Sequence, residues 1–434
     1  MTPLRIALAG LVALAVAMGI GRFAFTPLMP MMLNDGVVDL ARASWLASTN
    51  YVGYLVGAVL CTLDPWLRRR LGATRPRPID GPALVRRGLA ATALLTLAMA
   101  LPWPATWPAL RFAAGVVSAY VLLQSSGWCL AQLASRGKPG LGGVMFAGPG
   151  LGIVASGLLG GAMVSWQWRA STGWIVFALL AALLTAAIWR VFRRENEAAR
   201  PLIARTVPAT AAAPVTPDEH HGRAEVGVLA VAYGIAGFGY IVTATFLPVI
   251  AREAIAGSPL IDLFWPIFGA GIVCGALLAS RVSAAIDRRR LLAGAYVMQA
   301  AGIGLGVVWP TEIGFAVGSL MLGFPFTALT LFALQEARRI RPLATASTMG
   351  FVTTIYALGQ ALGPPMVAML LQLSGGDAHA AFQRSLVIAA ASLLVGAALF
   401  MASAREWPIR AASAIGRRAR AWASAHERPG PDGR

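Results

Sequence analysis

Charged residues are scarce in this 434-residue chain. They make up 12% of it, against roughly a quarter in typical soluble domains, while hydrophobic residues make up 57%. Apolar runs of about 20 residues, the length that spans a bilayer core, recur along the whole chain. This composition excludes an ordinary soluble protein and indicates an integral membrane protein.

Acidic residues are half as frequent as basic ones. All 18 fall in predicted loops or at helix ends, with Asp262 and Glu336 the nearest to the membrane core. We therefore expect no carboxylate at mid-membrane, where it could carry protons or bind a cationic drug. Proton coupling would then need a helix-end acid, a titrating substrate or an unusual relay.

Residues that form disulfides or bind metals are also few. The three cysteines lie in separate apolar runs without CxxC spacing, and the four histidines lie in loops or the tail: Cys61, Cys129, Cys274, His220, His221, His379 and His426. This pattern indicates neither a disulfide framework nor a metal site. Because converging nucleophiles and carboxylates are missing too, the sequence predicts neither an enzyme nor a cofactor.

Basic residues are plentiful, and their distribution is informative. The chain has 36 of them and a net charge of +18, in short blocks between alternate apolar runs. With the N-terminus placed in the cytoplasm, 30 fall on the cytoplasmic side, four fall outside, and Arg22 and Arg111 fall within helices. This bias predicts an inner-membrane protein with both termini in the cytoplasm, and it argues against a nucleic-acid surface.

The apolar segments predict an all-helical protein of twelve transmembrane helices. They lie near 6–33, 43–63, 88–104, 108–133, 140–164, 171–192, 226–250, 260–280, 291–309, 312–335, 345–373 and 380–404. The first is too long for a signal peptide and is expected to remain in the protein. We expect a six-helix half at 1–192, a cytoplasmic linker at 193–225, a second half at 226–404 and a basic cytoplasmic tail at 405–434.

An internal repeat supports two similar halves. Gly19, Ile20 and Phe23 match Gly234, Ile235 and Phe238; Gly53 and Gly57 match Gly271 and Gly275; Gly148 and Pro149 match Gly363 and Pro364. The offsets are all close to 215 residues. Since each half crosses the membrane six times, the two halves have the same orientation and form a parallel repeat.

This organisation resembles the major facilitator superfamily. The loop after the second helix keeps Asp64, Arg68 and Arg69 of that superfamily's motif, although Leu60, Pro65 and Leu67 depart from it. Arg111 and Gly115 in helix 4, GPGLG at 148–152 in helix 5, and Asp287 and Arg288 before helix 9 fit further motifs. MGIGRFAFTPLMP in helix 1 is similar to the YbfB/YjiJ-type branch. The resemblance implies a secondary transporter that works by alternating access, with helices 1, 4, 7 and 10 lining a central cavity.

Arg22 is the most informative candidate. A charge at membrane depth is costly and usually faces protein or water. Helical spacing places Arg22 on one face with Phe25 and Thr26, and the equivalent face of helix 7 presents Tyr233 and Tyr240. Arg22 could clamp a carboxylate or phosphate of the substrate. Alternatively, it reaches the outer interface or pairs with an acid such as Asp35.

Three further polar or aromatic stripes are candidates for substrate binding: Tyr120, Gln124 and Trp128 in helix 4, Asn50 and Tyr54 in helix 2, and Tyr356 and Gln360 in helix 11. Hydrogen bonding between helices explains these stripes about as well as substrate contact does. The helix 4 stripe lies almost opposite Arg111, so both cannot face one cavity.

The resemblance also suggests residues for coupling and gating. Asp64, Arg68 and Arg69 could latch the cytoplasmic side, or they could only set the topology. Arg111 could take part in coupling or could anchor helix 4 at the interface. The two Gly-Pro pairs, Gly148-Pro149 and Gly363-Pro364, are expected to allow packing and bending.

These observations lead to one main functional hypothesis. We expect a carrier of a small anionic or polar organic solute, with efflux coupled to protons as the favoured mode. A carrier of neutral sugars or hydrophobic drugs is the alternative within the class, and a ligand sensor without transport is the alternative outside it. The expected partners are the solute, protons and the lipid bilayer, with no nucleic acid, and the chain is expected to act as a monomer.

Overall fold

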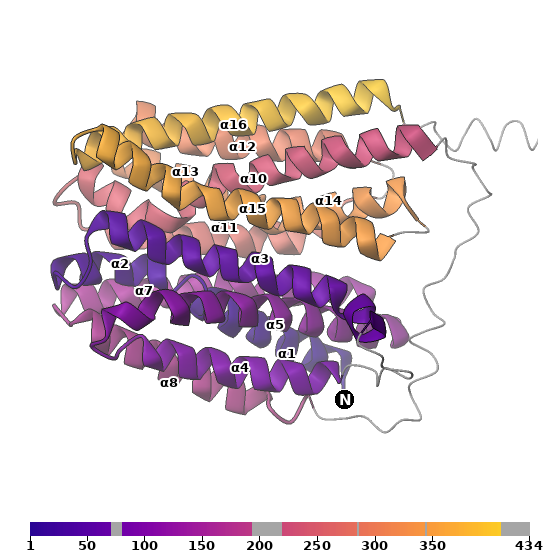
Figure 1. Ribbon diagram of the computed structural model, residues 1–434, viewed down its shortest axis with the longest axis horizontal. Helices are drawn as coiled ribbons and strands as arrows, with labels where there is room; N and C mark the ends of the chain where they lie inside the picture. The colour runs from indigo at the N-terminus through magenta and orange to yellow at the C-terminus, as the bar shows by residue number, and fades with distance from the viewer. Residues whose placement is uncertain (71–79, 193–218, 284–285, 343–344, 409–434) are drawn as a thin grey trace, which may run out of the picture.

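The computed structural model describes residues 1–70, 80–192, 219–283, 286–342 and 345–408. Within these ranges the chain folds into long helices that lie side by side in one bundle, with the N-terminus at one end (Figure 1). Most of the expected linker and of the tail lie outside the described residues. The helix α10 begins at Glu219 and α16 continues to Glu406, so both extend beyond the expected boundaries of the second half.

The N-terminal half is built from the following elements. They are α1 (Pro3–Leu14), the π-helix η1 (Ala15–Ile20), α2 (Phe25–Asn34), α3 (Leu40–Arg70), α4 (Gly81–Ala98), η2 (Pro104–Thr106), α5 (Trp107–Ser135), η3 (Pro139–Leu141), α6 (Gly142–Phe146), α7 (Gly148–Ser165) and α8 (Ala170–Ile188). The elements α1, η1 and α2 form one continuous span, as do α6 and α7.

The C-terminal half repeats this arrangement. Its elements are α10 (Glu219–Ala254), η5 (Ile261–Leu263), α11 (Phe264–Ala279), α12 (Arg288–Val308), α13 (Glu312–Gly323), α14 (Phe326–Ile340), α15 (Thr345–Leu373) and α16 (Ala378–Glu406). The two halves meet where α3 packs against α15, α7 against α11 and α2 against α10. In Figure 1 the indigo-to-magenta half and the crimson-to-yellow half occupy opposite sides of the bundle.

Among the described residues, ten helical stretches are long and apolar enough to cross a membrane. They agree with ten of the twelve expected segments. The remaining two segments correspond to α3 and α4, which pack in the same bundle against α5. The helix α4 has 18 residues and carries Arg86 and Arg87. It is therefore shorter and more polar than most of the ten apolar stretches. The count of twelve therefore stays a prediction.

Several helices start where the sequence supplies a capping side chain. Asp80 accepts a hydrogen bond from the amide of Ala83 at the start of α4, at 3.1 Å. Asp287, Thr311 and Asp377 accept equivalent bonds at the starts of α12, α13 and α16. Each cap satisfies one amide that has no partner inside the helix, and so fixes where the helix begins.

Glycines allow backbones to touch at matching places in the two halves. A Cβ atom on Gly57 of α3 would lie 2.7 Å from the carbonyl oxygen of Val116 in α5. In the second half, a Cβ atom on Gly275 of α11 would lie 1.7 Å from the carbonyl oxygen of Phe324, beside α14. No side chain fits at either point. The repeat in the sequence thus reflects the same close helix crossing in both halves.

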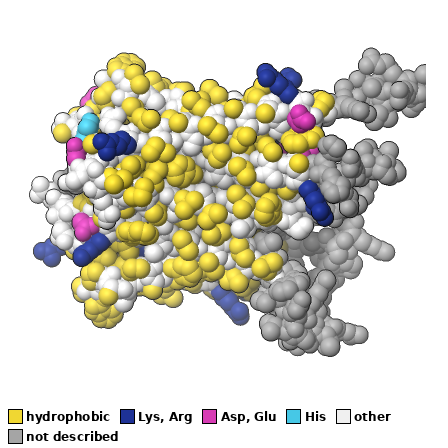
Figure 2. Space-filling view, turned by 45° about the horizontal axis from the view of Figure 1, so that its top comes forward, with side chains coloured by type: hydrophobic (Ala, Val, Ile, Leu, Met, Phe, Trp, Pro, Cys, Tyr) yellow, Lys and Arg dark blue, Asp and Glu magenta, His cyan; other side chains and the backbone are white. Residues whose placement is uncertain are grey.

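The outer surface has the character expected of a membrane protein. Hydrophobic side chains cover the middle of the molecule, and charged side chains gather toward its two ends (Figure 2). Leu94, Leu179 and Leu183 are 67%, 64% and 68% exposed, far more than a water-soluble surface would favour. These leucines mark a face that contacts lipid hydrocarbon.

A cluster of charges closes one end of the C-terminal half. The guanidinium of Arg289 is almost fully buried and pairs with Asp287 at 2.9 Å, and with Glu225 and Glu336 at 3.4 Å. It also donates to the carbonyl oxygens of Ser403 and Trp407, so it ties α10, α12, α14 and α16 together. Burial raises the pKa of the Asp287 carboxyl, but hydrogen bonds from Arg289 outweigh this and hold that pKa below its usual range.

We expect Arg289→Gln to destabilise the protein by about 3–5 kcal/mol, because it breaks the buried ion pair with Asp287 and leaves Arg339 as the remaining partner of Glu225 and Glu336 among the described residues. The thermal unfolding midpoint of the purified protein in detergent measures this. Arg290→Gln is the matched control: Arg290 is exposed, so its loss should change stability by no more than about 0.5 kcal/mol. A wild-type midpoint for Arg289→Gln would show that the cluster does not hold this half together.

Candidate functional site

The first membrane span is interrupted next to the candidate arginine. After α1, the amides of Gly21 and Phe23 donate to carbonyls five residues back, at Val16 and Met18, which is the π-helical pattern. The amide of Thr26 then donates to Phe23, three residues back, at 3.1 Å. A regular helix would pair these groups four residues apart. Local departures of this kind are frequent at functional sites.

Arg111 of α5 repairs this interruption. Its guanidinium donates to the carbonyl oxygens of Gly21 at 3.4 Å and Arg22 at 3.1 Å. The same group lies 4.8 Å from the centre of the Phe25 ring. With 2% exposure, Arg111 is buried rather than at an interface. Its contacts in the described structure are those of a cap for the broken helix, because backbone carbonyls in a membrane must find donors within the protein.

Arg22 lies in the interior, between the two halves. It is 2% exposed, and its Nη2 donates to Oε1 of Gln360 in α15 at 2.5 Å. The guanidinium lies 4.1 Å from the ring centre of Tyr54 and 4.9 Å from that of Tyr51, both in α3. Asp35, the acid considered as a partner, instead accepts a hydrogen bond from the amide of Ala170.

Aromatic side chains of the C-terminal half continue from this point. Gln360 donates to the hydroxyl of Tyr240 in α10. The Tyr240 ring lies 5.0 Å edge-on from Phe326 and 6.2 Å from Tyr356, with the two tyrosine rings nearly parallel. Tyr356 in turn stacks on Tyr233 at 4.3 Å. Arg22 is therefore one end of a connected row of polar and aromatic groups that passes from one half into the other.

The positive charge of Arg22 lacks a counter-charge in this arrangement. Ion pairs among the described residues involve Arg42, Arg252, Arg289 and Arg339, and none includes Arg22. Its Nε atom is buried and has no hydrogen-bond partner. The buried guanidinium of Arg22 is thus surrounded mainly by a neutral amide and aromatic rings.

Three hydrogen bonds join the halves on the side of Arg22 away from the N-terminus. Thr26 donates to the carbonyl oxygen of Ala244 at 3.1 Å, and Ser48 donates to that of Ala361 at 2.9 Å. The hydroxyls of Tyr51 and Thr245 lie 2.8 Å apart. Residues 13–29 of the first span and 239–251 of α10 are all buried. The two halves are therefore closed against each other here.

Other candidate residues lie elsewhere in the N-terminal half. Phe25 packs against Trp174 of α8, with ring centres 6.5 Å apart, and Asn50 donates to the carbonyl oxygen of Arg111 at 2.9 Å. Gln124 lies 3.4 Å from the sulfur of Cys61, and Trp128 packs against Phe192 at 5.2 Å. Tyr120 is half-buried on the same helix, α5. These contacts stay within the half and do not join the row around Arg22.

The Gly-Pro pairs differ between the halves. Gly148 and Pro149 begin α7 directly after a break that ends α6, and a Cβ atom on Gly148 would lie 2.2 Å from the carbonyl oxygen of Leu11. Gly363 and Pro364 lie inside the continuous helix α15. The side chains of Asp64, Arg68 and Arg69, at the end of α3, lie outside the described residues.

Sequence reasoning missed Tyr51, Phe326 and the Arg289 cluster. Tyr51 is three residues from Tyr54, a spacing that places both rings on one side of α3. Phe326 follows the break between α13 and α14, where helical spacing cannot be extended. For the Arg289 cluster, the sequence did offer a signal. Glu336 and Arg339 are three residues apart on one helix, a spacing that favours the ion pair they form beside Arg289.

Comparisons with known proteins agree with this architecture. Residues 14–401 match the family model described as "Uncharacterised MFS-type transporter YbfB". The fold is similar to the crystal structure of a mutant of the nucleoside transporter NupG, with a TM-score of 0.66 and 13% identity, covering 92% of this chain and 99% of that chain. It is also similar to a D-xylose-proton symporter, with a TM-score of 0.65 and 14% identity, covering 91% and 96%. No curated protein matches the chain.

The structural likenesses are below 25% identity and show the shared fold alone. The family match covers most of the chain and confirms the resemblance to the major facilitator superfamily and its YbfB branch. This match makes the chain a multi-pass membrane transporter rather than an enzyme. The chain belongs to the family of MFS-type transporters described as YbfB.

Proposed function

We propose that this transporter carries a small organic anion, and that Arg22 binds the anionic group. The observation that carries the proposal is the buried guanidinium without a counter-charge. An unpaired buried ion costs at least several kcal/mol. Stacking on Tyr54 offsets about 2 kcal/mol of this, and the hydrogen bond to Gln360 about 1.5–3 kcal/mol. A bound carboxylate or phosphate supplies the missing compensation.

Gln360 occupies the place where the substrate anion would bind. Its amide oxygen is a neutral acceptor 2.5 Å from Nη2 of Arg22. A carboxylate is a stronger acceptor for a guanidinium and can bind it through two parallel hydrogen bonds. The substrate therefore displaces Gln360 from Arg22, while Tyr51, Tyr54 and Tyr240 provide flat walls for an apolar or aromatic body.

This exchange connects binding with movement of the halves. Arg22 belongs to the N-terminal half, and Gln360 and Tyr240 belong to the C-terminal half. A substrate bound between them changes the link that holds the halves together, which is what rocking around a central site requires. With the N-terminus in the cytoplasm of an inner-membrane protein, the hydrogen bonds at Thr26, Ser48 and Tyr51 lie on the outer side of Arg22 and would hold that side closed.

Efflux by proton antiport is the favoured mode within this proposal. Among the described residues, the buried acids are Glu225 and Glu336, and both belong to the Arg289 cluster rather than to the row around Arg22. One oxygen of Glu336 is buried without a hydrogen-bond partner. Because neither acid belongs to the row around Arg22, coupling to protons would need a titrating substrate or a relay. The solved neighbours named for nucleosides and D-xylose share the fold, and the charge of Arg22 argues for a different substrate class here.

The first test is ligand binding by the wild type and by Arg22→Gln. A ligand at 100 times its dissociation constant adds about 2.7 kcal/mol of stability. We expect organic acids, but not sugars or lipophilic cations, to raise the thermal midpoint of the wild type in detergent. Loss of the charge partner costs about 2–5 kcal/mol, so Arg22→Gln should bind the same acid at least thirty-fold more weakly. Equal binding by both proteins would reject the role of Arg22.

The acid identified in this way also distinguishes a carrier from a sensor. Liposomes containing the protein and loaded with unlabelled acid should take up the labelled acid by counterflow. Binding without exchange would contradict transport and would leave a ligand sensor. Liposomes with Arg22→Gln are the control for leakage.

The second test places a carboxylate inside the site. Gln360→Glu should form an internal ion pair with Arg22, raise the thermal midpoint without ligand, and abolish stabilisation by the acid. Gln360→Met, of similar volume but without charge, leaves the guanidinium free and should keep the response to the acid. If Gln360→Glu still bound the acid with an affinity within about two-fold of wild type, the anion would bind somewhere other than Arg22.

A further inference from the structure

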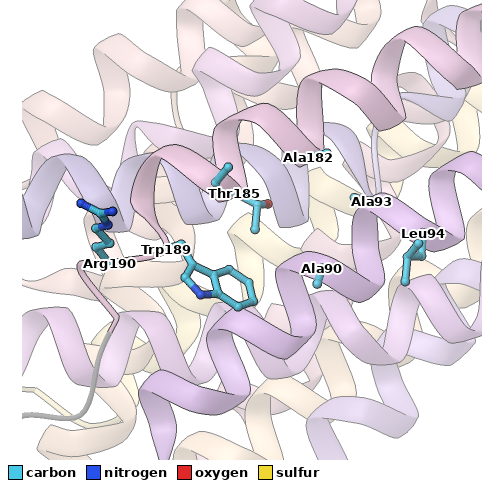
Figure 3. A pocket seen from close by; sticks show the side chains of 8 residues that line it. Ala90, Ala93, Leu94, Ala182, Thr185, Trp189 and Arg190 are labelled. Atoms are coloured by element: carbon cyan, nitrogen blue, oxygen red, sulfur yellow. The ribbon is translucent and has the colours of Figure 1, made fainter.

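A groove of about 530 Å³ opens on the side of the N-terminal half, between α4 and α8 (Figure 3). Its walls are mainly small or apolar residues, including Ala90 and Leu94 from α4 and Ala182 and Ala186 from α8. Leu94 is 67% exposed, and Leu179 and Leu183 of α8 are exposed to a similar degree, as expected of side chains that face lipid hydrocarbon. An apolar groove on such a surface is filled by an acyl chain rather than by water.

One end of the groove is basic. Trp189 and Arg190 follow directly after the last residue of α8, and both line the groove. Arg86 lies one helical turn before Ala90 in α4, and its guanidinium is 5.4 Å from the centre of the Trp189 ring. Figure 3 shows the Trp189 ring extending toward Ala90, with Arg190 beyond it at the end opposite Leu94. The groove thus leads from an apolar floor to two arginines.

Two polar groups beside the groove lack hydrogen-bond partners. Thr185, which lines it, is 5% exposed, and its buried hydroxyl has no partner. The Nε atom of Arg86 is likewise buried without one. Such groups are costly in a membrane, where water is not available to satisfy them. Both can donate a hydrogen bond, so a ligand that carries acceptors would satisfy them.

We propose that this groove binds an acidic phospholipid. Its acyl chain lies along Ala90, Ala182 and Ala186, its phosphate contacts Arg86 and Arg190, and its ester oxygens accept a hydrogen bond from Thr185. The basic end of the groove is the end of α4 and α8 that the positive-inside bias places in the cytoplasm, where acidic lipid headgroups attract arginine. This site is separate from Arg22 and does not depend on the transported substrate.

The test measures lipid retention by the full-length protein in detergent, using native mass spectrometry with dioleoyl phosphatidylglycerol and dioleoyl phosphatidylcholine. We expect phosphatidylglycerol to bind more tightly. Arg86→Gln and Arg190→Gln should each weaken it about five-fold, the effect of one arginine near an acidic headgroup. The matched control is Arg87→Gln, an exposed residue on another face of α4. Equal retention of both lipids, or an equal loss in the control, would overturn the proposal.

A second variant tests the acyl chain. Ala182 is exposed, so Ala182→Leu should fold normally while it fills the groove and displaces phosphatidylglycerol. Unchanged binding in this variant would show that the lipid does not use the groove. Inorganic phosphate at millimolar concentration is the final arm. If it stabilised the wild type as well as phosphatidylglycerol does, the arginines would form a site for a soluble anion and the lipid proposal would fail.

Discussion

The membrane offers no hydrogen-bond partners, and the structure depends on this constraint. Every backbone N–H and C=O group at membrane depth must find its hydrogen-bond partner inside the protein. A long regular helix meets this need because its backbone groups bond to one another. The first span departs from a regular helix at η1 and the following turn, so its carbonyls need outside donors. Arg111 supplies them from α5. Arg111 thus stabilises the irregular backbone around Arg22. The side chain of Arg22 extends from this turn to the contact between the two halves.

The two halves treat buried charge in opposite ways. In the C-terminal half, Arg289 is surrounded by three carboxylates and two carbonyl oxygens, so its charge serves to hold four helices together. In the N-terminal half, Arg22 has a neutral amide and aromatic rings. Both residues are buried to a similar degree, and only the first has its charge balanced. Arg111 has no carboxylate either, but its guanidinium donates to two backbone carbonyl oxygens, whereas that of Arg22 donates to a single neutral amide.

Much of the fold could be predicted from the sequence. Composition and the parallel repeat predicted the membrane class and the two halves, and Arg22 stood out because a charge in an apolar run is rare. Side-chain directions near Arg22 could not be predicted in the same way. The spacing rule that grouped Arg22 with Phe25 assumes 3.6 residues per turn, but the π-helical turns before Arg22 and the tight turn after it change the phase of the helix. Phe25 consequently packs against Trp174, away from Arg22.

The repeat also explains why the charge occurs only once. Gly237, the counterpart of Arg22, has no room for a side chain, since a Cβ atom there would lie 2.2 Å from the carbonyl oxygen of Tyr356. α10 therefore lies directly against α15, and this contact brings Tyr240 close to Gln360. One half provides a cation on an open turn, and the other provides a neutral acceptor on closely packed helices. A second arginine at 237 would separate those helices and place two like charges side by side, so under the proposed function the asymmetry would leave the anion a single place to bind.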